Sequence, residues 1–318
     1  MRLTIITINY NSSENTINLL ESLKNQTDKD FEVMVVDNNS NDVEKLMNYQ
    51  TSETNIIYIK NDRNLGYSGG NNVGIKKALN PPPPERVDGG GADWVLLLNN
   101  DIWVESGFIE RLRADLDSKD GIIGLALDEG ERTAFGGLIQ WLKPTLKHVY
   151  DSRLAMSLIT DIASRYYAIG GAMLIHKSIF DKIGFLDENY FLYFEDADFC
   201  QRARKAGIPI SFLSTELLGR LKHGQETTPR KIKIFHSVSA STKKLGSPLL
   251  LRYHYRNALY FNLKNGSWNI KLLTWPWSWL IIVKQIIKII IGKNKEQSFA
   301  ILKGVGDWYS GKMGKLHD

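Results

Sequence analysis

The chain has 318 residues, of which 43% are hydrophobic and 24% charged, and this composition is typical of soluble globular proteins with one large or two smaller domains. The formal net charge of +5 is mild, so no nucleic-acid partner is expected. The single cysteine, Cys200, excludes an internal disulfide and fits a reducing compartment. Met1 and Arg2 lead directly into an apolar run without a signal-peptide pattern, so we expect a cytoplasmic catalytic face.

The first third of the chain alternates between strands and helices. Short apolar runs predict three strands, at Leu3–Ile8, Phe31–Val36 and Ile56–Ile59. Ser12 or Ser13 is expected to cap a helix that runs to Leu23, and a second helix is expected over Val73–Leu79. Strands separated by single helices indicate a parallel sheet with right-handed crossovers.

The next strand, Trp94–Leu98, is followed at once by Asn99, Asn100 and Asp101. Parallel sheets bind ligands at the carboxyl ends of their strands, where this triplet falls. One carboxylate beside two amides can hold a divalent ion and leave positions open for phosphate oxygens. The alternative is an ordinary turn after a core strand. Polar clusters also end two earlier strands, at residues 9–11 and 37–42, which favours the functional interpretation.

A glycine-rich stretch containing Gly66, Gly69 and Gly70 precedes the predicted second helix. Such a stretch can cradle a phosphate on helix N–H groups, although a flexible turn explains it equally well. The dinucleotide and P-loop fingerprints are absent from the sequence. Four prolines at 81–84 and three glycines at 89–91 indicate a surface loop without chemistry of its own.

The second half is less regular. A helix is expected over Gly107–Leu116 and a strand over Ile122–Leu127. Residues 129–162 show no clear period, and the small-residue turn that begins at Ala168 runs into a strand that ends at Ile175. The acidic segment Glu195–Asp198 opens a helix for which Gly207 is the expected C-cap. Acidic residues in a first turn often only stabilise the helix through its dipole. The field of that dipole also predicts a lowered pKa for a carboxylate at this end, which would keep a general base ionised.

Eight motifs lie in order along about residues 1–262 of the chain. They are T-I-I-T-I-N-Y-N (4–11), V-V-D-N-N-S (35–40), N-D-R-N-L-G-Y-S-G-G-N-N (61–72), L-L-L-N-N-D (96–101), G-G-A-M-L-I (170–175), F-L-Y-F-E-D-A-D-F-C-Q-R (191–202), H-S-V-S-A-S (236–241) and Y-R-N (255–257). Together they resemble the inverting nucleotide-sugar glycosyltransferases of family 2, and most closely the rhamnosyltransferase-like members.

This resemblance implies an α/β fold of the GT-A type, a Rossmann-like, mixed and mostly parallel sheet flanked by helices. It places a catalytic domain at residues 1–242, with the nucleotide-sugar half at about 1–102 and the acceptor half at about 103–242. A helical C-terminal extension is expected over residues 243–318.

The resemblance also assigns a donor site and a metal site. The residues that it places at the nucleotide-sugar donor are Asn9, Asn11, Asp37, Asp62, Arg63, Asn64, Gly69, Asn72 and Asn100. Asp101 would ligate Mn2+ or Mg2+, with His236 as a further metal or diphosphate contact or, alternatively, a structural histidine. The triplet departs from the D-x-D motif of the family because its first two positions are amides, and fewer negative charges imply weaker metal binding.

On the acceptor side, Asp196 matches the catalytic base and Glu195 supports it, while Gly171, Asp198 and Arg256 are assigned to the acceptor half. The implied reaction moves a sugar from dTDP-rhamnose, or else from a UDP-sugar, to a hydroxyl of a glycan or lipid-linked acceptor in cell-surface polysaccharide synthesis. Two alternatives stay open. One is a sugar nucleotidyltransferase, although such enzymes usually carry a basic glycine-rich loop after the first strand, and the other is a non-catalytic nucleotide-sugar binding module.

The C-terminal part contains a long apolar helix candidate, Trp268–Ile291. Pro276 and two lysines, Lys284 and Lys288, interrupt it, so it is a poor spanning helix. Tryptophans at one end and lysines on a narrow polar face predict a helix that lies in the interface of an anionic membrane. The alternative is a helix packed on the catalytic domain or in a homodimer.

Overall fold

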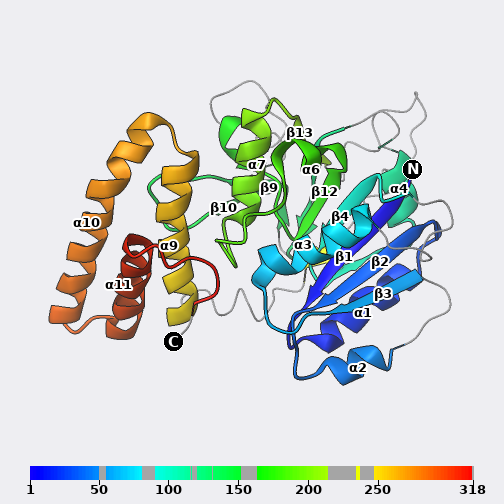
Figure 1. Ribbon diagram of the computed structural model, residues 1–318, viewed down its shortest axis with the longest axis horizontal. Coiled ribbons are helices and arrows are strands. Elements are labelled where there is room, and N and C mark those ends of the chain that lie inside the picture. The colour runs from blue at the N-terminus through cyan, green and yellow to red at the C-terminus, as the bar shows by residue number, and fades with distance from the viewer. Residues whose placement is uncertain are drawn as a thin grey trace.

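The computed structural model describes residues 1–49, 55–80, 90–114, 116, 120–130, 132–151, 163–213, 234–236 and 247–316. Its centre is a seven-stranded sheet in the order β13-β6-β12-β4-β1-β2-β3 (Figure 1). The strands are β1 (Leu3–Asn9), β2 (Phe31–Asp37), β3 (Asn55–Lys60), β4 (Trp94–Leu98), β6 (Ile122–Leu125), β12 (Ala172–His176) and β13 (Ile210–Leu213). The strand β12 runs antiparallel to β4 and β6, and the other neighbouring pairs are parallel. The predicted mixed, mostly parallel sheet is therefore confirmed.

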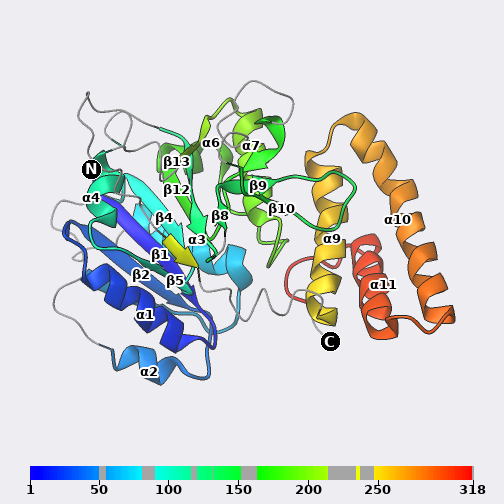
Figure 2. The same cartoon turned by 180° about the vertical axis from the view of Figure 1, so that it is seen from behind.

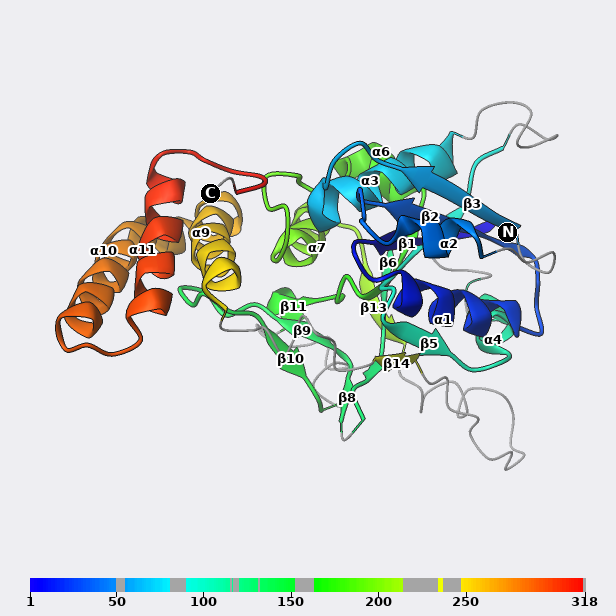
Figure 3. The same cartoon turned by 90° about the horizontal axis from the view of Figure 1, so that it is seen from below.

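Helices cover both faces of this sheet (Figure 3). One face packs on α1 (Ser13–Lys24) and α4 (Phe108–Ala114), and the other on α3 (Gly66–Leu79), α6 (Ser178–Ile183) and α7 (Glu195–Lys205). Successive strand residues alternate between the two cores: Leu96 packs in the first and Leu97 in the second. Burial on both faces explains why these strands are apolar throughout. The short helix α2 (Val43–Met47) follows β2.

Two small sheets accompany the central sheet. The first has the order β5-β14-β7-β8, with β5 (Ile102–Val104), β7 (Leu127–Asp128), β8 (Thr133–Ala134) and β14 (Ile234–His236). The second has the order β10-β9-β11, with β9 (Gly136–Leu138), β10 (Lys147–Val149) and β11 (Tyr166–Tyr167), the last preceded by the short helix η1 (Ala163–Arg165). The predicted strand over 122–127 is thus divided between β6 and β7, which belong to different sheets.

Three helices form the C-terminal extension: α9 (Pro248–Asn265), α10 (Trp268–Ile290) and α11 (Lys295–Tyr309). They share a small core around Leu259, Ile301 and Trp308. Figures 1 and 2 show α9 between α7 and the other two helices. Along the described part of the chain, α10 is the one helix long and apolar enough to cross a membrane by length and composition.

Local details correct some of the sequence expectations. Ser12 is the N-cap of α1, but its side chain makes no cap hydrogen bond; instead Ser13 N–H donates to Asp42 Oδ2 at 2.9 Å. The C-cap of α7 is Ala206 rather than the predicted Gly207, which follows it in the left-handed region with φ +71°. Most of the proline and glycine run at 81–91 lies outside the described residues.

The glycine-rich stretch does not precede the helix, because α3 begins at Gly66 and contains the other glycines. Small residues are needed there since α3 packs closely on the sheet: a Cβ at Gly70 would lie 2.9 Å from Asn38 Nδ2. Gly66 has φ +72°, and a Cβ on it would overlap the carbonyl oxygen of Phe191. The start of α3 is therefore fixed against the segment that leads into α7.

Gly66→Ala is expected to lower the free energy of unfolding by about 1–3 kcal/mol, because alanine strains a left-handed backbone and meets Phe191. Gly306→Ala is the matched control, since Gly306 lies within α11 and a Cβ there meets nothing within 4 Å. That substitution is expected to stabilise the protein by up to about 1 kcal/mol. Denaturant unfolding measures both, and equal effects in the two variants would contradict the close approach at Gly66.

Candidate active site

The side chain of Asn9 organises the carboxyl ends of the central strands. It is fully buried, and its Nδ2 donates to Asp37 Oδ1 at 2.8 Å and to Ser40 Oγ at 3.0 Å. The other oxygen of Asp37 accepts the Ser40 N–H at 3.0 Å. These bonds fix the orientation of the Asp37 carboxylate at the end of β2, with Asn9 behind it as support.

The same network reaches the triplet after β4. Thr16 Oγ1 donates to Asn9 Oδ1 at 2.9 Å and accepts from Asn100 Nδ2 at 2.9 Å. Asn100 therefore connects through α1 to the ends of β1 and β2. We gave Thr16 and Ser40 no role from sequence, because only the fold brings α1 and the turn after β2 against the strand ends.

Other predicted donor residues lie around this edge. Asn11, Asp62 and Arg63 are exposed, and Asn11 Oδ1 accepts the Asn41 N–H at 2.8 Å. Asn64 Oδ1 accepts the Gly66 N–H at 2.8 Å and so holds the start of α3.

The predicted direct donor contact of Asn72 is not supported. Its side chain is buried, and Nδ2 donates at 2.9 Å both to the Leu186 carbonyl and to Glu188 Oε1. Its Oδ1 in turn accepts the Leu186 N–H at 3.1 Å. Asn72 thus joins α3 to the segment before α7, and Gly69 lies on the same side, where an added Cβ would be 3.7 Å from Glu188 Oε2.

The strand pairing brings the two predicted metal residues together in space. His236 is the antiparallel register partner of Ile102, the residue after Asp101, although 135 positions separate His236 from Asp101 (236 − 101). Within the described residues, no group of three or more His, Cys, Asp or Glu side chains is placed to hold a metal ion.

Three carboxylates occupy the first turn of α7, and their environments differ. Glu195 is 5% exposed and Asp198 is fully buried, whereas Asp196 is partly exposed. Asp196 Oδ2 accepts the Gly170 N–H at 3.0 Å, and its Oδ1 accepts the Ala197 N–H at 2.7 Å. Of the three, Asp196 is the carboxylate that a substrate can reach.

Burial raises the pKa of Asp196, although the backbone N–H groups of Gly170 and Ala197 and the charge of His148 oppose the shift. Burial also raises the pKa of Glu195 well above its ordinary value, and the neighbouring Asp196 charge adds to this. The lowered pKa expected from the helix field is therefore wrong. The low-dielectric surroundings penalise the charged form more than the helix start favours it.

Asp198, which the sequence assigned to the acceptor half, uses both carboxylate oxygens within the protein. Its Oδ1 accepts from Asn265 at 2.7 Å and from the Tyr190 hydroxyl at 3.2 Å. Its Oδ2 accepts from Arg202 Nε at 2.8 Å and Lys264 Nζ at 3.0 Å. This buried carboxylate anchors α7 to α9.

Arg256 is also fully buried, and its guanidinium donates to carbonyl oxygens of the protein, including that of Tyr190 at 3.1 Å. The polar atoms of this side chain are thus used within the protein, and its assignment to the acceptor half stays a prediction. Gly171 lies beside the triplet, because its carbonyl accepts the Asn99 N–H at 2.9 Å.

Tyr67 connects α3 to the segment that contacts α7, and nothing in its motif singled it out. The side chain is partly buried, and its phenol donates to the Gly170 carbonyl at 2.5 Å. Burial raises its pKa well above the ordinary value, and the charges of Glu195, Asp196 and Asp101 add to this. The candidate base and the candidate metal ligand thus lie around one tyrosine.

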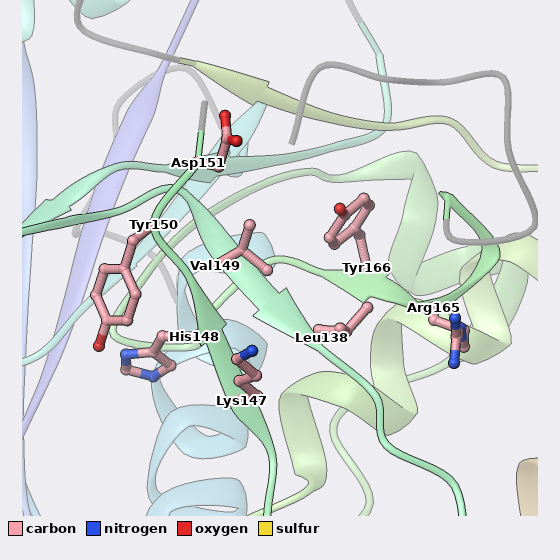
Figure 4. A pocket seen from close by; sticks show the side chains of 8 residues that line it. All are labelled: Leu138, Lys147, His148, Val149, Tyr150, Asp151, Arg165 and Tyr166. Atoms are coloured by element: carbon pink, nitrogen blue, oxygen red, sulfur yellow. The ribbon is translucent and has the colours of Figure 1, made fainter. Parts of the chain in front are cut away.

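A cavity of about 290 Å³ opens on the three-stranded sheet (Figure 4). Its lining residues are Leu138, Lys147, His148, Val149, Tyr150, Asp151, Arg165 and Tyr166. His148 Nδ1 lies 2.9 Å from Glu129 Oε1, and a charge on its imidazole would lower the pKa of Asp196. Most of the lining residues come from the region 129–162, in which the sequence shows no clear period.

Comparison with known proteins adds a family and relatives. The model of the family described as "Glycosyl transferase family 2" matches residues 4–184. The low-salt glycan biosynthesis hexosyltransferase Agl10 of Haloferax volcanii is 32% identical over 222 residues, which are 65% of this chain and 63% of that protein. The chain thus matches less than two thirds of the length of this relative. The N-acetylglucosaminyl-diphospho-decaprenol L-rhamnosyltransferase of Mycobacterium tuberculosis is 24% identical, with 71% of this chain and 78% of that protein covered.

Among solved structures, the mannosyltransferase PcManGT from Pyrobaculum calidifontis, in complex with GDP-Man and Mn2+, superimposes with a TM-score of 0.52 at 12% identity. The match covers 98% of this chain and 88% of that one. A likeness at this identity shows the fold, and it confirms the GT-A fold expected from the sequence.

Glu195→Gln is expected to stabilise the protein at neutral and alkaline pH. Because burial raises the native pKa of Glu195 above its unfolded value, the native state binds more protons than the unfolded chain between the two. The stability of the wild type therefore falls as the pH rises through the native pKa, and neutral glutamine avoids this loss. Denaturant unfolding at about pH 8 should show the advantage, which should shrink at about pH 4. An equal advantage at both pH values would contradict the raised pKa.

Proposed function

The chain belongs to the family 2 glycosyltransferases, and from this premise we propose that it transfers a sugar from a nucleoside-diphosphate sugar to a hydroxyl of a glycan or lipid-linked acceptor. The observation that carries the proposal is the position of Asp196. It is the reachable carboxylate of the acidic turn, and Tyr67 and Gly170 hold that turn beside the triplet that ends in Asp101.

The donor would bind at the carboxyl ends of β1, β2 and β4, which is where ligands of parallel sheets bind. The oriented Asp37 carboxylate suits the single N3–H donor of a thymine or uracil base, and the exposed Asp62 and Arg63 suit the ribose and phosphates. We propose dTDP-rhamnose as the donor, supported by the rhamnosyltransferase relative. A UDP-sugar is the second choice.

The chemistry is a single displacement with inversion at the anomeric carbon. The acceptor hydroxyl gives its proton to the Asp196 carboxylate as its oxygen forms a bond to that carbon. The bond from the anomeric carbon to the diphosphate oxygen breaks, and the nucleoside diphosphate leaves with that electron pair. The raised pKa of Asp196 makes its carboxylate a stronger base than an ordinary exposed aspartate.

Asp101 is the proposed ligand of Mn2+ or Mg2+, and His236, which pairs with the next residue, is the proposed second contact. One carboxylate beside an amide fits an ion that takes its remaining oxygens from the donor diphosphate and water. When bound, a divalent ion supplies charge neutralisation for the departing diphosphate.

We further propose that the enzyme works at the cytoplasmic face of a membrane in cell-surface glycan synthesis. Support for a lipid-linked acceptor comes from the name of the mycobacterial relative, whose substrate is a diphospho-decaprenol. Further support comes from α10, in which the polar and apolar sides are reversed relative to a soluble surface helix. The polar residues Thr274, Ser278 and Gln285 are buried, whereas Trp268 is 79% exposed and Ile290 77%.

The exposed side of α10 is apolar along its whole length, about 34 Å for 23 residues. Its exposed large apolar side chains are Trp268, Leu272, Leu273, Trp275, Trp279, Leu280, Val283, Ile286, Ile287 and Ile290. Because the opposite side packs on the rest of the extension, α10 is suited to lie in a bilayer interface rather than to span it. Exposed lysines such as Lys271, Lys284 and Lys293 border this face, which favours anionic lipid.

Asp196→Asn is expected to lower turnover by about 10²–10⁴-fold, the usual contribution of a general base, while donor binding is retained. The assay combines dTDP-rhamnose, Mn2+ and an N-acetylglucosaminyl-diphospho-prenol, and it follows both dTDP release and the glycosylated lipid. Donor binding is measured by thermal shift, since a ligand at 100 times its Kd stabilises a protein by about 2.7 kcal/mol.

The same assay separates the proposal from its alternatives. A wild type that only converts the donor and pyrophosphate to a nucleoside triphosphate and a sugar 1-phosphate would be a nucleotidyltransferase. One that binds donors without turnover would be a binding module. If no nucleotide sugar shifts the melting temperature, the glycosyltransferase proposal fails. If Asp196→Asn loses donor binding but keeps turnover, Asp196 is a binding residue and Glu195 becomes the candidate base.

The full-length protein is expected to sediment with anionic vesicles at low salt and to be released by high salt, which screens the lysines. Trp279→Glu should weaken this binding about tenfold or more, because it removes a large apolar side chain from the lipid-facing side. Met47→Glu, at an exposed apolar position on α2, is the matched control and should bind as the wild type does. A wild type that stays in the supernatant and forms a dimer in sedimentation would assign the face of α10 to a second copy instead.

A further inference from the structure

The segment before the candidate base has a conformation that its own residues disfavour. We call residues 187–194 the pre-base loop. Phe191, Tyr193 and Phe194 have φ values of 63°, 70° and 76°, in the left-handed region that aromatic residues rarely adopt. Phe194 is also the N-cap of α7, so its backbone sets the direction of the turn that bears Glu195 and Asp196. Such a conformation persists only where its surroundings enforce it.

The helix α9 supplies this restraint through one asparagine. Asn257 is fully buried, and its Nδ2 donates to the carbonyls of Tyr190, Leu192 and Tyr193 at 3.0, 2.8 and 3.1 Å. These three carbonyls span the turn that contains the left-handed residues. A single carboxamide therefore holds the backbone of the pre-base loop from inside.

Arg256 fixes that asparagine and the other end of the loop. Its Nε donates to Asn257 Oδ1 at 2.9 Å, which orients the carboxamide so that its N–H groups face the loop. Its Nη2 donates to the carbonyls of Asn189 and Tyr190 at 3.3 and 3.1 Å. The rigid fork of a guanidinium suits this set of acceptors, which a lysine cannot match.

Ring contacts from the same helix continue along the loop. Tyr253 stacks on Phe191 with centroids 5.4 Å apart, and His254 stacks on Tyr193 at 4.1 Å. The segment after α11 closes on the same place, since Arg256 Nη1 donates to the carbonyl of Gly314 at 2.8 Å and Gly314 N–H donates to that of Asn189, also at 2.8 Å. The C-terminal extension is thus connected by hydrogen bonds to the residues that lead into the base.

We propose that Arg256 and Asn257 are positioning residues for Asp196, which hold the pre-base loop in its left-handed form so that the first turn of α7 presents the carboxylate to the acceptor hydroxyl. This inference rests on the proposed function of Asp196. Neither side chain touches substrate, because both are fully buried with their donors directed at the protein. Their effect is on turnover rather than on donor binding, since Asp37 and Asn100 are held by Asn9 and Thr16, which lie outside the pre-base loop.

The test compares Asn257→Ala with Asn262→Ala. Asn262 is a matched control because it is a buried asparagine of the same helix whose side-chain nitrogen has no hydrogen-bond partner in the described part of the chain. Asn257→Ala is expected to lower kcat by about 10-fold to 100-fold, the usual effect of a small misplacement of a reacting group. Its donor KM should stay within about twofold of the wild type, and Asn262→Ala should leave both constants near the wild-type values. Equal kcat values in the two variants, or a raised donor KM with unchanged kcat in Asn257→Ala, would overturn the proposal.

Arg256→Lys is the second variant, in case Asn257→Ala does not fold. Lysine keeps the charge but loses the planar guanidinium, so kcat should fall by less than in Arg256→Met. A wild-type kcat in both variants would overturn the role of Arg256.

Hydrogen exchange gives a readout that needs no activity. The amides of residues 189–194 should lose protection in Asn257→Ala but not in Asn262→Ala, and unchanged protection in both would overturn the restraint itself. A wild type that transfers no sugar would instead refute the proposed function and leave the exchange result standing.

Discussion

The candidate site depends on one buried amide, that of Asn9. Asn9 ends β1, the strand between β2 and β4. Its side chain donates directly to Asp37 at the end of β2, and it is linked through Thr16 to Asn100, which follows β4. Because an unmade hydrogen bond of a buried amide costs about 1–3 kcal/mol, its partners are held in place as strongly as core residues are. The carboxyl ends of β1, β2 and β4 are therefore fixed before any ligand binds, and such preorganisation favours precise recognition of a nucleotide.

A second constraint joins α7 to the helix α9 of the extension. The fully buried carboxylate of Asp198 is compensated by Arg202 of its own helix and by Lys264 and Asn265 of α9. Removing either side would leave an uncompensated buried charge, so the two helices are expected to move as one body. By its contacts, α9 is thus part of the wall of the candidate active site, whereas α10 and α11 lie further out.

The C-terminal extension has its polar groups inside and an apolar surface outside. Inside it, Ser278 bonds to the Tyr309 hydroxyl at 2.6 Å and Gln285 accepts from Ser298 at 3.0 Å. Its outer side offers water a continuous apolar surface, which monomeric soluble proteins rarely do. If that side rests on lipid, the hydrogen bonds from α9 and the last residues to the pre-base loop place the base in a fixed relation to the membrane.

The sequence by itself determined the strands, the helices between them and the polar ends of the strands, because these follow from local period and from the abrupt change from apolar runs to Asn and Asp. It also placed Asp196 and Asp101 through motifs. It could not decide which of Glu195, Asp196 and Asp198 is reachable, since the rotation of α7 about its axis is set by packing against α9, more than 60 residues away. Nor could it give the sign of the pKa shift of Asp196, because the helix field is local whereas desolvation depends on everything that surrounds the group. For the same reason Asn72, Asp198 and Arg256 were assigned to ligands by motif, and only the tertiary structure showed that their polar atoms are used within the protein.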